Sequence, residues 1–324
     1  MCEGEGVYIE KMANYPVGKL IAEMRRRRGI SQMELAGEIC SVSTISKIEN
    51  GVQAPSRKVC EGLMQRLGIP ITGSRLYISS EELQKSMIEE QIIHCMDAGR
   101  YEKAGELLQI YEQMRGNHED GVLEQQFALR VRGNLLLALG TNLPLAEEVL
   151  VKALRLTIPE MDLEHPERLT LLTNEELAIL QKFSEVSYAL GNQARGKRLH
   201  FFLKGYLETA KTDELAHIRI YPGVVSTLAR WLEADGRFAE ALQFCEYGIS
   251  VCMEYGRLTE FPKLMETKTY ALIALGRKEE AAVSLQQVCT ILQSLGEPMK
   301  AQLVEKNAKA LFQGNDAAAD SHFR

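Results

Sequence analysis

The chain has 324 residues with 38 basic and 44 acidic side chains, so its formal net charge is −6. On the whole chain, this balance argues against nucleic-acid binding, because phosphate contacts need basic surface. No run of about 20 apolar residues is present, so we expect no membrane-spanning helix. The acidic start lacks the regions of a signal peptide, and the seven cysteines form no CxxC pair. Both features suggest a reducing, cytoplasmic location.

The charge is divided unevenly along the chain. Residues 1–75 hold 11 basic and 8 acidic side chains, a net charge of +3, which leaves −9 on the remainder. Without the first eleven residues, the range 12–75 holds 10 basic and 5 acidic side chains. This asymmetry predicts a small basic domain joined to a large acidic one, each with its own partner.

Residues 17–70 are predicted to form four or five short helices. Ser31 and Glu34 form a capping box that starts the second helix. A further short helix follows over residues 41–50, and Pro55 opens another. Two short helices joined by a tight turn are the helix-turn-helix geometry, in which the second helix enters the major groove of DNA.

The helix over residues 41–50 is expected to read DNA. Ile45 and Ile48 would hold it to the core, which leaves small polar side chains opposite for base edges and phosphates. Gln32 begins the preceding helix and is suited to a phosphate. The basic run 25–28 adds positive charge, although a solvated helix face is the alternative. The predicted DNA-binding residues are Arg27, Arg28, Gln32, Ser41, Ser43, Thr44, Lys47 and Asn50.

The rest of the chain repeats a helical unit. Gly-Arg, with Ala five residues after the Gly, recurs from Gly99, Gly236 and Gly276, and weaker copies occur at Gly140 and Gly191. The Gly would end one helix, and the small residue would let the next helix cross it closely. One such hairpin cannot bury its apolar faces alone, so the copies are expected to stack into a solenoid. The expected hairpins cover residues 80–115, 122–157, 173–208, 222–256 and 262–296, with a last helix from Pro298 to about Phe312.

Two parts of the sequence resemble known families. Residues 29–36 (GISQMELA), 44–51 (TISKIENG) and 55–56 resemble the Xre/Cro-type helix-turn-helix. The repeats look like degenerate tetratricopeptide (TPR) repeats, and the short turn at 39–41 is similar to that of the PlcR and NprR regulators. These belong to the quorum-sensing group that includes Rap, Rgg and PrgX. The family usually starts after residue 11, so Met12 is a candidate initiator beside Met1.

The resemblance implies a cytoplasmic homodimer that reads a palindromic site in double-stranded DNA. Its TPR groove would bind a short signalling peptide that modulates DNA binding. The alternative is a TPR interaction protein that binds and inhibits a signalling protein, with DNA binding secondary. The acidic solenoid would repel phosphate, and we expect it to favour a basic or neutral peptide. Under either hypothesis we expect no enzyme, because no P-loop, GxGxxG or GxSxG motif is present, and we expect no metal and no cofactor.

The expected fold is therefore all-α. A helix-turn-helix domain at 12–75 precedes a TPR-like solenoid at 80–312 and a disordered tail at 313–324. The first helix of each hairpin would line the groove, where side-chain amides can satisfy the backbone of an extended peptide. A solvated surface position is the alternative for each candidate, and packing between hairpins for the tyrosines. The predicted peptide-binding residues are Gln126, Arg130, Asn134, Asn174, Glu185, Tyr188, Ser226, Arg230, Lys268 and Tyr270.

Overall fold

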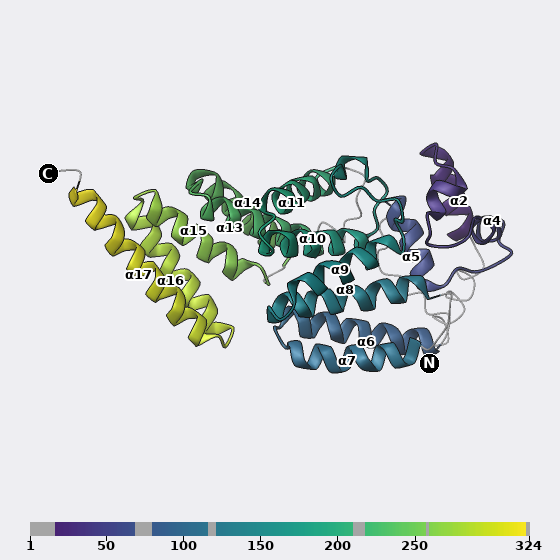
Figure 1. Cartoon of the computed structure of the whole chain (residues 1–324), viewed down its shortest axis with the longest axis horizontal. Coiled ribbons are helices and arrows are strands. Elements are labelled where there is room, and N and C mark those ends of the chain that lie inside the picture. The colour runs from purple at the N-terminus through teal and green to yellow at the C-terminus, as the bar shows by residue number, and fades with distance from the viewer. Residues whose placement is uncertain (1–16, 69–79, 116–120, 210–217, 257–258, 322–324) are drawn as a thin grey trace, which may run out of the picture. The chain divides into compact units, whose positions relative to one another are not determined.

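The computed structural model describes residues 17–68, 80–115, 121–209, 218–256 and 259–321 (Figure 1). Within these ranges the chain forms α-helices and one 3-10 helix and contains no β-strand, which confirms the predicted all-α class. The chain divides into two compact units between residues 216 and 217, and each unit is described by itself. Both candidate initiators, the boundary at residue 75 and residues 322–324 lie outside the described residues.

The first unit begins with four short helices. Their bounds are α2 (Val17–Arg27), α3 (Gln32–Ala36), α4 (Val42–Glu49) and α5 (Arg57–Arg66). Serine side chains cap three of them: Ser31 forms the predicted capping box with Glu34, and Ser41 and Ser56 cap α4 and α5. Apolar side chains from all four helices close one core, formed chiefly by Ile21, Leu35, Ile45, Ile48, Leu63 and Leu67.

Three helical hairpins follow in the same unit. Their helices are α6 (Ser80–Asp97), α7 (Tyr101–Arg115), α8 (Val122–Leu139), α9 (Leu143–Arg155), α10 (Asn174–Ala189) and α11 (Gln193–Leu207), with the 3-10 helix Pro166–Arg168 before α10. The two helices of each hairpin pack side by side (Figure 1). Helix α8 also contacts α10, so the first helices of successive hairpins are neighbours, as in a TPR-like solenoid.

The second unit continues the pattern. Its helices are α13 (Tyr221–Ala234), α14 (Phe238–Glu254), α15 (Phe261–Ala274), α16 (Lys278–Ser294) and α17 (Pro298–Ser321). Helix α15 contacts both α13 and α17. Helix α17 extends to Ser321, beyond the end at Phe312 that the sequence predicts. The extension lies in the tail predicted over 313–324 and includes three alanines at 317–319, which have high helix propensity.

The repeated glycines act as the sequence predicts. All five end the first helix of a hairpin with a positive φ: Gly99 (70°), Gly140 (61°), Gly191 (92°), Gly236 (75°) and Gly276 (72°). The small residues that follow are buried where the helices cross, and Ala104, Ala146, Ala241 and Ala281 are all 0% exposed. At Gly196 a Cβ atom would lie 2.8 Å from the carbonyl oxygen of Ser184, so α10 and α11 approach closely there.

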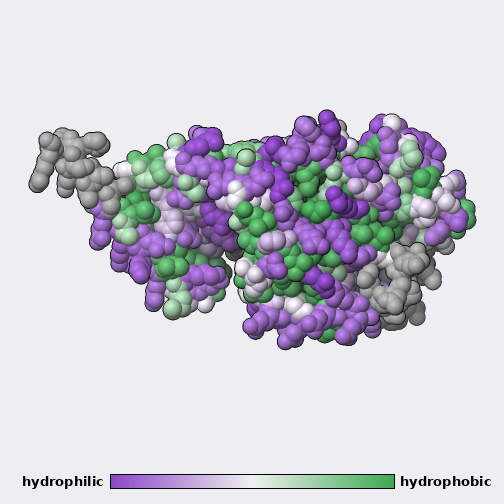
Figure 2. Space-filling model, in the orientation of Figure 1, coloured by the Kyte–Doolittle hydropathy of each residue, from purple (hydrophilic) through white to green (hydrophobic). Residues whose placement is uncertain are grey.

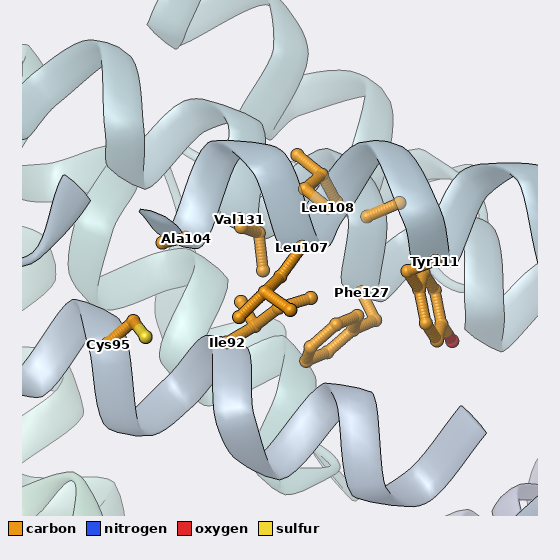
Figure 3. Packing of buried hydrophobic residues seen from close by; sticks show 9 residues of the cluster. Ile92, Cys95, Ala104, Leu107, Leu108, Tyr111, Phe127 and Val131 are labelled. Carbon is orange, nitrogen blue, oxygen red and sulfur yellow. The ribbon is translucent and has the colours of Figure 1, made fainter. Parts of the chain in front are cut away.

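The interior of the first hairpins is filled by side chains from three helices. Ile92 of α6, Leu107 and Tyr111 of α7, and Phe127 and Val131 of α8 all point into one cluster (Figure 3). The rings of Tyr111 and Phe127 meet edge to face with their centroids 5.2 Å apart. Burial of these faces between neighbouring hairpins supplies the stability that a single hairpin lacks.

Hydrophilic and hydrophobic residues are mixed over the face that Figure 2 draws. In the part of the chain that the structure describes, each helix is too short or too polar to cross a lipid bilayer.

Candidate nucleic-acid interface and solenoid face

Helix α4 is seated on the domain core by its apolar side. Ile45 and Ile48 are 0% and 1% exposed. The Ser41 hydroxyl oxygen accepts a hydrogen bond from the backbone nitrogen of Thr44 at 3.0 Å, and the two hydroxyl oxygens lie 2.8 Å apart. Two predicted DNA-binding residues therefore also fix the first turn of this helix.

The opposite side of α4 is polar and exposed. Ser43, Lys47 and Asn50 follow one another at four- and three-residue steps and are all exposed, as the sequence predicts. Among the described residues, Lys47 has no acidic partner within ion-pair distance. A hydroxyl, an ammonium and an amide thus share one open helix face, which is a set suited to base edges and phosphates.

The arginines of the run 25–28 lie in different surroundings. Arg27 forms an exposed ion pair with Glu23, with Nη2 2.6 Å from Oε1. Arg26 is exposed and Arg28 is half-buried. Arg25 is turned inward and is 13% exposed. Because an exposed ion pair contributes little, the guanidinium of Arg27 remains available to a phosphate, whereas Arg25 does not.

Arg25 and Gln32 converge on a single buried carboxylate, that of Glu49. The guanidinium Nε and Nη2 lie 2.6 and 2.8 Å from the two carboxylate oxygens, and Gln32 Nε2 donates to Oε2 at 2.8 Å. Burial alone would raise the pKa of Glu49, but these hydrogen bonds and the nearby positive charge lower it. Gln32, predicted to contact phosphate, therefore uses one of its two N–H donors to tie α3 to α4.

A second polar cluster ties the start of α5 to the solenoid. Lys58 Nζ lies 2.7 Å from Glu89 Oε1 and 4.9 Å from the centre of the Phe127 ring. Arg57 Nη2 lies 3.0 Å from Glu89 Oε2, and the Tyr111 hydroxyl donates to Glu89 Oε1 at 2.5 Å. Burial alone would raise the pKa of Glu89, but these partners together lower it. Sequence reasoning missed this cluster.

Charge counting could not separate surface from interior cations. Arg25, Arg57, Lys58 and Arg66 contribute to the basic excess of residues 12–75, yet all four form ion pairs and are at most 18% exposed. One signal was available: Arg66 stands three residues after the core residue Leu63, on the apolar side of its helix. The exposed basic surface of the domain is therefore smaller than its net charge suggests.

In the first unit, two of the predicted peptide-binding residues, Arg130 and Asn174, lie close to the start of α10. Arg130 Nε lies 2.5 Å from Glu175 Oε1, and the guanidinium carbon lies 5.1 Å from the centre of the Phe127 ring. Asn134, one turn further along α8, is half-buried, and its Oδ1 atom forms no hydrogen bond within the described residues. Asn174 is half-buried at the first position of α10. These residues form the half-buried polar face of α8 and α10.

Gln126 does not belong to that face. Its side chain is 0% exposed, and Nε2 donates to the Ala153 carbonyl oxygen at 3.0 Å and to Thr157 Oγ1 at 2.7 Å. The expectation that it lines an open groove is therefore wrong, because Gln126 lies on the side of α8 that packs against α9. Further along α10, Glu185 pairs with Lys182 at 2.9 Å, and Tyr188 lies under Lys197.

The remaining candidates lie in the second unit. Ser226 is only 6% exposed, so the expectation that it meets a ligand is also wrong. Arg230 is exposed, and among the described residues it has no acidic partner within ion-pair distance. Lys268 Nζ lies 3.8 Å from Glu246 Oε1. The hydroxyl of Tyr270 donates to Glu266 Oε1 at 2.9 Å while its ring packs on two core clusters.

This geometry defines a helix-turn-helix domain followed by TPR-like helical repeats. The comparisons with known proteins agree: residues 21–73 match the helix-turn-helix family. The helix-turn-helix is a DNA-binding motif. No curated protein sequence matches the chain.

Solved structures with low sequence identity share the fold of nearly the whole chain. PlcR of Bacillus thuringiensis, in complex with the peptide PapR7 and DNA, is 19% identical with a TM-score of 0.58 over 89% of this chain and 98% of its own. The apo competence regulator ComR of Streptococcus vestibularis is 17% identical with a TM-score of 0.52 over 91% and 97%. ComR of S. thermophilus, in complex with DNA and its signalling peptide ComS, is 16% identical with a TM-score of 0.52 over 91% and 99%.

Proposed function

We propose that this protein is a cytoplasmic transcription regulator that acts as a homodimer on a palindromic site in double-stranded DNA. Residues 12–75 would read the DNA, and the solenoid at 80–312 would bind a short signalling peptide that alters DNA binding, as in quorum sensing. One observation carries the DNA-reading part. Ser43, Lys47 and Asn50 form an open polar face on a helix whose other side is locked into the core.

The peptide-binding part is supported by the polar face of α8 and α10. Arg130 can exchange the carboxylate of Glu175 for a carboxylate or carbonyl of a peptide, because an oxygen of either group can accept the single hydrogen bond that Nε now donates to Glu175. The buried Oδ1 of Asn134 can accept a backbone N–H. The complexes of PlcR with peptide and DNA, and of ComR with DNA and peptide, support the same pairing of partners.

DNA binding is tested with the full chain. A duplex site would be selected from a random library, and its affinity measured between low and moderate salt concentrations. We expect a two-fold symmetric site, a dimer in sedimentation experiments, and a steep loss of affinity with salt. Failure to enrich any sequence above a control without protein would overturn the DNA-reading function.

Peptide binding is tested by the melting temperature of the full chain against short synthetic peptides, since a ligand of the folded state raises it. The substitutions R130Q and N134A should abolish the shift that an active peptide produces. R132Q is the matched control, because Arg132 lies on the same helix but is exposed and pairs with Glu112 of α7. A protein partner retained by the solenoid, with no peptide active, would favour the inhibitory interaction protein instead.

A further inference from the structure

The guanidinium of Arg66 is buried at the end of α5 and holds the end of α3. Its side chain is only 5% exposed. Nη1 donates to three carbonyl oxygens at distances of 2.9 to 3.2 Å, those of Leu35, Ala36 and Gly37. Carbonyl groups at the end of a helix lack partners within the helix. The backbone nitrogen of Ile39 already donates to the carbonyl oxygens of Ala36 and Gly37, so Arg66 adds a second donor to both and a donor to that of Leu35.

The solenoid holds the other side of the same guanidinium. Nη2 donates to Glu176 Oε1 at 3.0 Å. Glu176 is 0% exposed, and its Oε2 accepts a hydrogen bond from the backbone nitrogen of Thr173 at 2.6 Å, within the capping box that starts α10. Because the start of α10 fixes this carboxylate, Arg66 links α10 directly to α3.

Backbone features around Arg66, where α3, α5 and the start of α10 meet, favour one fixed geometry. Gln65 Oε1 accepts a hydrogen bond from the backbone nitrogen of Asn174 at 2.9 Å, beside the Arg66 contact. A Cβ atom on Gly37 would lie 2.3 Å from Arg66 Nη1, so only glycine permits this approach. Glu38 has a φ of 59°, which a non-glycine residue keeps only when its surroundings hold it. This turn leads into α4, the helix with the open polar face.

We propose that Arg66 is a positioning residue for α4, through which the start of α10 sets the turn between α3 and α4. Its connection to the solenoid face is short. Glu175 precedes Glu176 in α10 and pairs with Arg130 of α8. A ligand carboxylate or carbonyl that takes the Arg130 guanidinium releases Glu175 in the same helical turn that holds Arg66. This last step rests on the proposed function, whereas the link that Arg66 forms between α3 and α10 does not.

The test is backbone hydrogen exchange of the full chain without DNA or peptide, followed over residues 32–49. E176Q removes the charge partner of Arg66 while leaving an oxygen that can still accept from Thr173. R66K keeps the charge but cannot reach both groups of acceptors. E147Q is the matched control, because Glu147 forms a half-buried ion pair with Arg195 elsewhere in the same unit.

Expected results differ between the variants. E176Q and R66K should exchange about tenfold faster over residues 32–49, with α7 and α8 unchanged, because the turn opens locally. E147Q should match the wild type over residues 32–49. E175Q should give an increase of about threefold, since it acts on Arg66 through its neighbour.

Three outcomes would overturn the proposal. Unchanged exchange over residues 32–49 in E176Q and R66K would show that the contact between Arg66 and Glu176 does not hold the turn between α3 and α4. Faster exchange spread equally over α6–α11 would show that Arg66 and Glu176 stabilise the whole unit rather than the turn between α3 and α4. Unchanged exchange over residues 32–49 in E175Q would show that Glu175 does not couple Arg130 to Arg66. All three readouts are independent of DNA or peptide binding, so failure of the proposed function would show in the earlier experiments and not in this one.

Discussion

The guanidinium of Arg25 donates two hydrogen bonds to the carboxylate of Glu49, which lies 24 residues away in the sequence. Arg25 lies in the last turn of α2, and Glu49 is the last residue of α4. The pair therefore fixes the far end of α4 against α2, while the start of α4 is fixed by the Ser41 cap. Such support at both ends keeps the exposed face of α4 in one orientation.

Removing this carboxylate should loosen the domain. We expect E49Q to destabilise α2–α4 by about 3 kcal/mol, because a buried guanidinium loses its partner. Hydrogen exchange of α2–α4 in the full chain would then accelerate by about a hundredfold. E23Q is the control, since Glu23 forms an exposed pair with Arg27 and its loss should cost less than about 0.5 kcal/mol. Equal effects of E23Q and E49Q would contradict the special role of the buried pair.

Lys47 should matter for DNA affinity but not for stability. K47A removes an exposed ammonium, so we expect about a tenfold weaker affinity for the selected duplex and a shallower salt dependence if the contact is to phosphate. The melting temperature should not change. Lys152 is an exposed lysine of α9 in the same unit, and K152A should leave affinity within about twofold. A K47A protein that binds as tightly as wild type would exclude this face of α4 from the interface.

Two glycines of α11 should respond oppositely to alanine. G196A should destabilise the first unit by about 1–3 kcal/mol, because the new Cβ atom would press on the Ser184 carbonyl oxygen. G205A should stabilise the helix by up to about 1 kcal/mol, since no heavy atom lies within 4 Å of its Cβ position. Thermal unfolding of both variants is the measurement. A stabilising G196A would mean that α10 and α11 are not closely packed there.

Acidification should weaken the contact between α5 and α6. The pKa of Glu89 is lowered in the folded chain, so its stabilising effect is complete above the ordinary glutamate pKa of 4.5 and is lost as the pH falls through the lower folded value. Burial raises the pKa of the neighbouring Glu61, which acts in the opposite direction. Melting temperatures of wild type and E89Q between pH 7 and 3 should therefore converge. Parallel curves would show that Glu89 does not titrate as described.

Periodicity and glycine spacing predict the helices because both reflect local backbone chemistry. The ranges expected for the hairpins each match two helices to within one residue at their starts, and the turn glycines have the positive φ that their role requires. The open face of α4 also follows from spacing, since Ile45 and Ile48 fix which side is buried.

Contacts between distant segments do not follow from spacing. Gln126 looks like a groove residue on its helix, yet it turns toward α9 and bonds to Thr157. The position of Arg66 on the apolar side of its helix indicates that it is buried but does not indicate its partners, which stand 29 and 110 residues away. The choice between an inward and an outward side chain depends on which neighbouring element offers acceptors, and a single sequence does not contain that information.

Helix α5 carries polar anchors at both ends, Arg57 and Lys58 on Glu89 and Arg66 on Glu176. A chimera that exchanges the DNA-reading domain by a cut after residue 68 would therefore leave two carboxylates of the recipient solenoid without their cations. Such hybrids should aggregate or stay inactive unless the donor supplies the same cations at matching positions. Replacing only the exposed residues of α4 avoids this problem. Such a replacement would change the DNA sequence that the protein prefers and would keep the contacts of α5 with Glu89 and Glu176.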